Sequence, residues 1–114
     1  LDLATDPLPE ERYDLVYSLM TLHHIPDTDA ILQRFHAVIA QPGWLCIADL
    51  DTEDGSFHGP GVDVHLGFDR AVLAAKARQA GFASVEFSTA WELVKTVDGE
   101  ARRFPVFLMV AHKA

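Results

Sequence analysis

The chain has 114 residues, of which 49% are hydrophobic and 10% aromatic, and its formal net charge is −8. This length suits a single domain over residues 1–114, and the apolar content is too high for a disordered chain. With 9 basic against 17 acidic residues, the chain lacks the basic stripe that nucleic-acid binding requires, so we expect a small-molecule partner and no nucleic acid.

The first predicted element is a strand over residues 13–20, which follows a polar loop over residues 1–12. Its apolar run predicts a strand that is buried on both faces. A polar turn with His23 and His24 comes next, and Pro26 closes it. Because ligands of open α/β sheets bind outside the carboxyl ends of the strands, we expect both histidines to lie near a site.

A helix is predicted over residues 28–40, with Asp27 or Thr28 as its N-cap and one apolar face that includes Phe35. The Gln41-Pro42-Gly43 run predicts its end. The second strand, residues 44–50, is apolar and contains Cys46, which we expect in the core. A strand, a helix and a strand with a crossover of this length predict parallel pairing in the right-handed sense.

Residues 52–67 form a long irregular segment that is rich in glycine and histidine, as lids and binding loops often are. Its carboxylates and imidazoles could hold a metal ion, but no tight ligand spacing such as H-E-x-x-H is present, and we predict no metal. A solvated acidic loop is a second alternative. The interpretation that we favour is a wall of a substrate pocket, with Asp51, Glu53, His58 and His65 as substrate-binding residues.

A second helix is predicted over residues 70–80, capped by Asp69 and ended by Gly81. The strand over residues 85–94 alternates apolar and polar side chains, which is typical of a strand with one wetter face at a sheet edge. Asp98-Gly99 is a hairpin signal, although the connection looks longer than two residues. Arg102-Arg103 is expected to be a solvated pair on this hairpin, with an anion site as the weaker alternative.

The last strand, residues 104–111, is apolar on both faces, which predicts a place inside the sheet. The predicted fold class is therefore α/β. It is a partial Rossmann-like, doubly wound sheet with the order βαβαββ, in which the antiparallel C-terminal strand is inserted between the second and third strands.

The cysteine content and the hydropathy of the sequence bear on the cellular compartment of the protein. One cysteine allows no intramolecular disulfide, no apolar run approaches the roughly 18 residues of a membrane span, and no signal-peptide pattern is present. We therefore expect a cytoplasmic location and no membrane partner. The sequence opens on Leu1 without an initiator Met, and we expect it to be a piece of a longer protein.

Several segments, in this order and spacing, resemble the second half of class I S-adenosylmethionine-dependent methyltransferases. They are Tyr-Asp-Leu-Val at 13–16, Leu-His-His-Ile-Pro-Asp at 22–27, Leu-Gln-Arg-Phe at 32–35 and Gln-Pro-Gly-Trp-Leu at 41–45. In that family these segments are the fourth strand, the helix after it and the fifth strand, and the closing hairpin here resembles the sixth and seventh strands.

The resemblance implies S-adenosylmethionine as cofactor and a small molecule as methyl acceptor. It places Asp2 and Leu3 at the adenine. Ser18 and Leu19 would lie at the cofactor near the transferred methyl group. His23 and His24 would be catalytic, since a neutral imidazole can accept a proton near neutral pH.

The sequence also departs from the family. The glycine-rich turn after the family's first strand is absent, and so is the acidic residue that holds the cofactor ribose. We therefore interpret the chain as the C-terminal part of a methyltransferase catalytic domain, and we expect it to be truncated and inactive alone. In such a piece the first strand would be a bare apolar edge, through which we expect a homodimer.

Two other functions remain open at this point. One is a non-catalytic dimerisation module that keeps a partial methyltransferase fold. The other is a fragment of a nucleotide-binding oxidoreductase, whose sheet would lack the inserted antiparallel last strand. The position of residues 104–111 therefore discriminates between the methyltransferase and the oxidoreductase.

Overall fold

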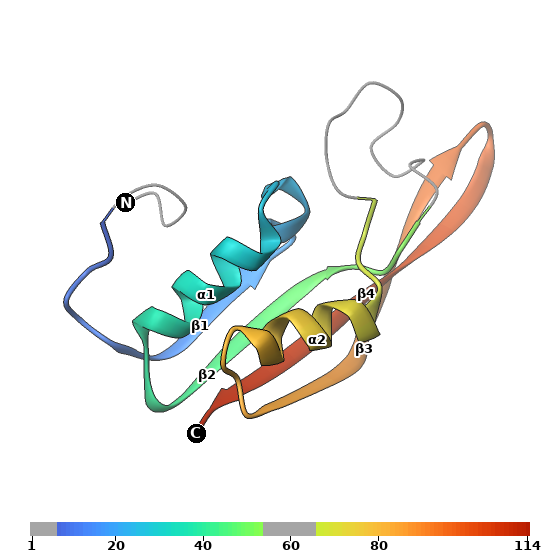
Figure 1. Cartoon of the computed structure of the whole chain (residues 1–114). Helices are drawn as coiled ribbons and strands as arrows, with labels where there is room; N and C mark the ends of the chain where they lie inside the picture. The colour runs from blue at the N-terminus through green and yellow to red at the C-terminus, as the bar shows by residue number, and fades with distance from the viewer. Residues whose placement is uncertain (1–6, 54–65) are drawn as a thin grey trace.

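The structure is a computed structural model, and it describes residues 7–53 and 66–114. The elements in chain order are β1 (Tyr13–Leu19), the short 3-10 helix η1 (Leu22–His24), α1 (Thr28–Val38), β2 (Ile39–Leu50), α2 (Arg70–Gln79), β3 (Ser84–Val97) and β4 (Glu100–Lys113) (Figure 1).

The four described strands form one sheet in the order β1-β2-β4-β3. β1 pairs with β2 in parallel, and β4 pairs antiparallel with both β2 and β3. The last strand is therefore inserted between the second and third strands, as the sequence predicts. Its inner position follows from its side chains, because Phe107 and Met109 are fully buried.

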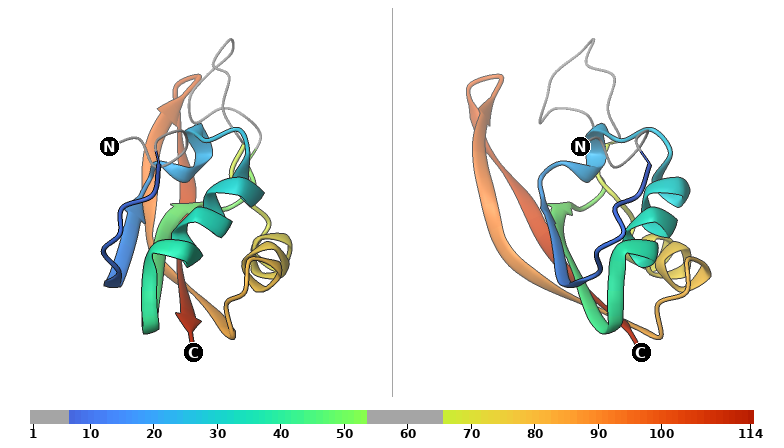
Figure 2. Two further views of the ribbon diagram at one scale, coloured as in Figure 1. Left: turned by 60° about the vertical axis from the view of Figure 1, so that its left-hand side comes forward. Right: turned by 90° about the vertical axis from the view of Figure 1, so that its left-hand side faces the viewer.

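Both helices cover the same face of the sheet (Figure 2). The Asp27 side chain caps α1 by accepting from the Ala30 N–H at 3.0 Å, and Asp69 caps α2 in the same way from Val72 at 3.0 Å. Residues of α1, α2, β2 and β4 make the main core; its largest members include Leu32, Phe35, Leu45, Ile47, Leu73, Phe107 and Met109. α1 ends at Val38, earlier than predicted, because Ile39 already begins β2.

β1 is not buried on both faces, so that expectation was wrong. Leu15 is 54% exposed, Tyr17 67% and Leu19 59%. Val16 packs against the core beneath the helices, so its neighbours Leu15 and Tyr17 point to the opposite face. Neither of the two described α-helices lies on that face (Figure 2). Cys46 of β2 lies on it too, which explains why this thiol is only partly buried; burial nevertheless raises its pKa.

The connection between β3 and β4 is shorter than the sequence predicted. Val97 pairs with Glu100, so the turn contains only Asp98 and Gly99, both with positive φ, as a tight two-residue hairpin requires. The ladder shifts between Thr89 and Trp91. This irregularity moves the apolar side chains of β3 from the helix-covered face to the opposite one.

In the part of the chain that the structure describes, neither helix is long and apolar enough to cross a membrane.

Candidate functional site

The site lies at one edge of the sheet, which we call the rim, made of residues 18–24 after β1 and 49–53 after β2. The two strands are parallel, so their carboxyl ends reach the same edge. At the end of β1, the Met20 N–H donates to the Ala48 carbonyl at 2.8 Å. Met20 has a φ of 54°, and this turn leads the chain off the sheet into η1.

Gly67 lets residues 66–68 lie against the end of β2. Its φ is +72°, and a Cβ at this position would clash with the backbone carbonyl of Asp51. The neighbouring Phe68 N–H donates to the Leu50 carbonyl at 2.9 Å, and the Glu53 N–H donates to the Leu66 carbonyl at 3.0 Å. A close approach and a left-handed backbone thus both favour glycine here.

A buried Asp49–His23 pair ties the two strand ends together. Asp49 is 0% exposed and His23 is 2% exposed. The carboxylate of Asp49 accepts from His23 Nδ1 at 2.7 Å, from the His23 backbone N–H at 3.0 Å and from the Leu50 N–H at 2.8 Å. Because an ionised carboxylate only accepts, the proton of the imidazole lies on Nδ1. Asp49 thereby fixes both the ring of His23 and the turn that carries it.

His24 differs from His23 in exposure. Its side chain is exposed at the rim, and its ring lies 4.2 Å from that of His23, centroid to centroid, with 41° between the planes. A small molecule at the rim could therefore meet His24, whereas the imidazole of His23 is enclosed by the protein.

Asp51 is held by Arg70 of α2. Arg70 Nε donates to Asp51 Oδ1 at 2.7 Å, and Arg70 Nη2 donates to Asp51 Oδ2 at 2.8 Å and to Thr89 Oγ1 at 2.9 Å. The hydrogen bond to Asp51 raises the pKa of Arg70. Such a two-point pair fixes the geometry of both groups. The carboxylate of Asp51 is thus engaged within the protein.

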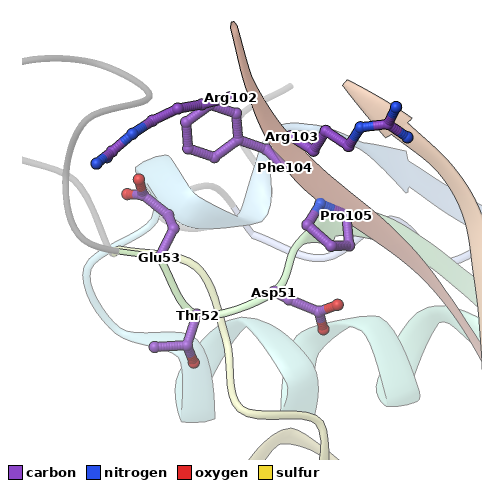
Figure 3. A pocket seen from close by; sticks show the side chains of 7 residues that line it. All are labelled: Asp51, Thr52, Glu53, Arg102, Arg103, Phe104 and Pro105. Carbon is purple, nitrogen blue, oxygen red and sulfur yellow. The ribbon is translucent and has the colours of Figure 1, made fainter. Parts of the chain in front are cut away.

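A cleft of about 380 Å³ opens beside the rim. One wall comes from the end of β2 and the other from β4; its lining residues are Asp51, Thr52, Glu53, Arg102, Arg103, Phe104 and Pro105 (Figure 3). The volume is in the range of small-molecule sites. The side chains of Glu53 and Arg102 lie on the same side of this cleft, while Asp51 turns in another direction (Figure 3).

The structure brings some of the predicted site residues together. His23, His24, Ser18 and Leu19 lie at the rim, and Asp51 and Glu53 line the cleft. Asp2, Leu3, His58 and His65 lie outside the described residues.

Two candidates were missed by sequence reasoning, namely the roles of Asp49 and Arg70. Asp49 carried a usable signal, because it is a charged residue in the otherwise apolar C-terminal half of β2, and the chain that follows the parallel strand β1 carries His23. The Asp51–Arg70 pair spans 19 positions, and no local pattern announces it. Arg102 is exposed, as expected for a solvated hairpin residue, and it also lines the cleft.

A model of the methyltransferase domain matches residues 2–95. The chain belongs to the methyltransferase-domain family. This confirms the family suggested by the sequence motifs. A curated relative, methyltransferase str2 of Strobilurus tenacellus, is 32% identical over 71 residues, which are 60% of this chain and 25% of that protein.

Solved structures share the fold. A SAM-dependent methyltransferase from Thermotoga maritima aligns with a TM-score of 0.74 at 15% identity, over 98% of this chain and 61% of its own. Phosphoethanolamine N-methyltransferase 2 of Haemonchus contortus, bound to phosphomonomethylethanolamine and S-adenosylhomocysteine, aligns with a TM-score of 0.74 at 15% identity, over 98% of this chain and 36% of its own. The methyltransferase-domain chain thus spans a quarter of its curated relative's length and about three fifths of the Thermotoga maritima protein's.

Family membership and strand order bear on the alternatives that the sequence left open. The inserted antiparallel β4 is the feature that the oxidoreductase sheet would lack. Neither the oxidoreductase nor the non-catalytic module is favoured.

Proposed function

We propose that this chain is the C-terminal part of a methyltransferase that transfers a methyl group from S-adenosylmethionine to a small molecule. The observation that carries the proposal is the rim itself. In a sheet with the methyltransferase strand order, two parallel strands end in polar residues beside a cleft of small-molecule size. The Haemonchus contortus enzyme, which is complexed with a small phosphorylated amine, supports an acceptor of this size class.

The residues at the end of β1 fit one side of the cofactor. Ser18 is half-buried and offers a hydroxyl, while Leu19 is 59% exposed and offers an apolar surface. Asp2 and Leu3 would border the adenine. When bound, S-adenosylmethionine supplies an electrophilic methyl group on a sulfonium, and the protein's contribution is to position the acceptor and exclude water.

Of the two histidines, we assign the contact with the acceptor to His24. It is exposed at the rim, so its imidazole can accept a proton from an acceptor near neutral pH. His23 is 2% exposed and bonded to Asp49, so it acts as a positioning residue for the turn. Glu53 and Arg102 would line the acceptor cleft, with His58 and His65 as further candidates for the same wall.

The catalytic test uses the enzyme that contains this sequence, with labelled S-adenosylmethionine and a panel of small acceptors. His24→Asn should lower kcat by about 100-fold or more if the imidazole acts as the base. Gln33→Ala, an exposed change on α1, should leave kcat unchanged. An unaltered kcat in His24→Asn would remove the proposed base.

A separate test concerns the chain by itself. Because the glycine-rich turn and the ribose-binding acid are absent from the sequence, the 114 residues should bind S-adenosylmethionine weakly or not at all. Isothermal titration calorimetry measures this directly. A dissociation constant in the millimolar range or tighter would contradict our assignment of the cofactor site to two halves of a longer domain.

A further inference from the structure

The wall of the cleft that follows β2 lies beyond the regular sheet. The pairing of β2 with β4 ends at Leu50, whereas residues 51–53 line the cleft on this side. The Asp51 N–H donates to the Pro105 carbonyl at 3.2 Å, and the Glu53 N–H donates to the Leu66 carbonyl at 3.0 Å. Among the described residues, isolated contacts rather than a strand ladder hold this wall, so a side-chain contact can decide its position.

Arg70 supplies such a contact from a rigid element. It is the first residue of α2, whose N-cap is Asp69. Its guanidinium bonds both carboxylate oxygens of Asp51, at 2.7 and 2.8 Å, and Nη2 also donates to Thr89 Oγ1 at 2.9 Å. The guanidinium carbon lies 6.0 Å from the centre of the Phe107 ring. The side chains of Arg70 and Asp51 are 31% and 26% exposed, so water screens the ion pair only in part.

The contact with Thr89 extends this bridge toward the opposite wall of the cleft. Thr89 is the residue of β3 that precedes the shift in the β3–β4 ladder. Farther along β3, residues 92–95 pair with residues 102–105 of β4, and these residues of β4 line the opposite wall. Arg70 therefore bonds one wall directly and reaches the other through the strand that is paired with it.

We infer that Arg70 is a positioning residue that fixes the two walls of the cleft relative to each other and thereby sets the orientation of the small molecule that binds there. That this molecule is the methyl acceptor rests on the proposed function, whereas the effect of Arg70 on the walls does not. The planar guanidinium suits this role, because it can bond two carboxylate oxygens and a hydroxyl at fixed angles, which a single ammonium group does not match.

The first experiment measures amide hydrogen exchange in the 114-residue chain, without cofactor or acceptor. In Arg70→Gln, the amides of Asp51 and Glu53 should exchange about tenfold faster, because the wall opens locally once the charge-assisted contact is lost. The Ala83 amide, which is bonded to the C-terminal end of β4, should exchange at an unchanged rate.

Two further variants test the geometry. Arg70→Lys keeps the charge but loses the two-point contact, so its exchange rates at Asp51 and Glu53 should lie between those of Arg70→Gln and the unaltered chain. Arg78→Gln removes an exposed guanidinium from the same helix and should change none of these rates. If Arg70→Gln accelerated exchange equally at Ala83, Arg70 would support the whole fold. If it left Asp51 and Glu53 unchanged, Arg70 would not hold the wall. Either result overturns the inference.

The second experiment uses the longer enzyme that contains this sequence. Arg70→Gln should raise KM for the acceptor by about tenfold and leave KM for S-adenosylmethionine unchanged, and Arg70→Lys should restore part of the loss. A general loss of stability would not separate the two KM values. An unchanged acceptor KM would overturn the role of Arg70 in orienting the acceptor. Absence of methyl transfer in the unaltered enzyme would contradict the proposed function, and the exchange rates would then decide the role of Arg70 by themselves.

Discussion

At the scale of single residues, Asp49 is the group on which the rim depends. Its buried carboxylate accepts three hydrogen bonds, two of them from His23. Asp49→Asn keeps the size of the side chain but removes the charge and one acceptor. We expect the free energy of unfolding to fall by about 2 kcal/mol. The variant weakens hydrogen bonds that a charged carboxylate accepted, and it leaves a buried partner poorly satisfied. Urea denaturation measures the change.

The matched control for Asp49 is a pair at the surface. Glu92→Gln removes the partner of Arg103 in an ion pair whose side chains are 44% and 76% exposed, and such pairs contribute about 1 kcal/mol at most. If Asp49→Asn and Glu92→Gln lowered the free energy of unfolding equally, the buried pair would contribute no more than an ordinary surface contact. A nitrogen-15 spectrum of the His23 ring should also report Nδ1 protonation in the unaltered chain.

At the scale of elements, Lys113 joins the last strand to the end of α1. Its Nζ donates to the His36 carbonyl at 2.7 Å and to the Ile39 carbonyl at 2.8 Å. A cation at this end of a helix satisfies free carbonyls and complements the helix dipole. Lys113→Met should therefore lower the free energy of unfolding by about 1–2 kcal/mol, while Lys95→Met on the exposed hairpin should change it little.

The same variant should alter the pH dependence of stability through His36. Burial lowers the pKa of His36, and the charge of Lys113 lowers it further. The unfolded chain thus binds a proton at higher pH than the folded one, so the contribution of His36 is present above its ordinary pKa and is lost as pH falls through the folded value. In Lys113→Met the pKa of His36 should rise, and stability should fall less steeply on acidification. An NMR titration that finds the same pKa in both proteins would refute this coupling.

At the scale of the whole molecule, the sequence predicted the strand order more successfully than it predicted exposure. The two apolar faces of β4 predicted an inner position in the sheet, and the polar residues that follow β1 and β2 predicted a common rim. Both predictions could be made because they depend only on local sequence patterns. Exposure of Leu15 and Tyr17 depends instead on what lies over the sheet. The described chain measures 49 × 28 × 19 Å. Its smallest dimension corresponds to the thickness of one sheet and one helix layer. A sequence pattern reports that a side chain is apolar, but it does not report whether the layer that would cover it is present.

Among the described elements, β1 lies at the edge of the sheet and one of its faces has no helix over it, and this leads to an expectation about assembly. β1 is an edge strand, and a second copy could pair with it antiparallel about a twofold axis, since such an interface uses the same surface twice. Tyr13, Leu15, Tyr17 and Leu19 are 42–67% exposed and carry no charge, so two copies would join these side chains into one apolar surface without bringing like charges together.

We therefore expect the 114-residue chain to be a dimer by light scattering at high concentration. Tyr17→Lys should shift it toward monomer, because the introduced charge would lie beside its symmetry mate. Val94→Lys makes the same change at a side chain that is 63% exposed on the hairpin, and it should leave the dimer intact. A monomer at high concentration would exclude pairing through β1. Dissociation by Val94→Lys but not by Tyr17→Lys would place the contact on the hairpin, and the apolar surface of β1 would then have no part in self-association.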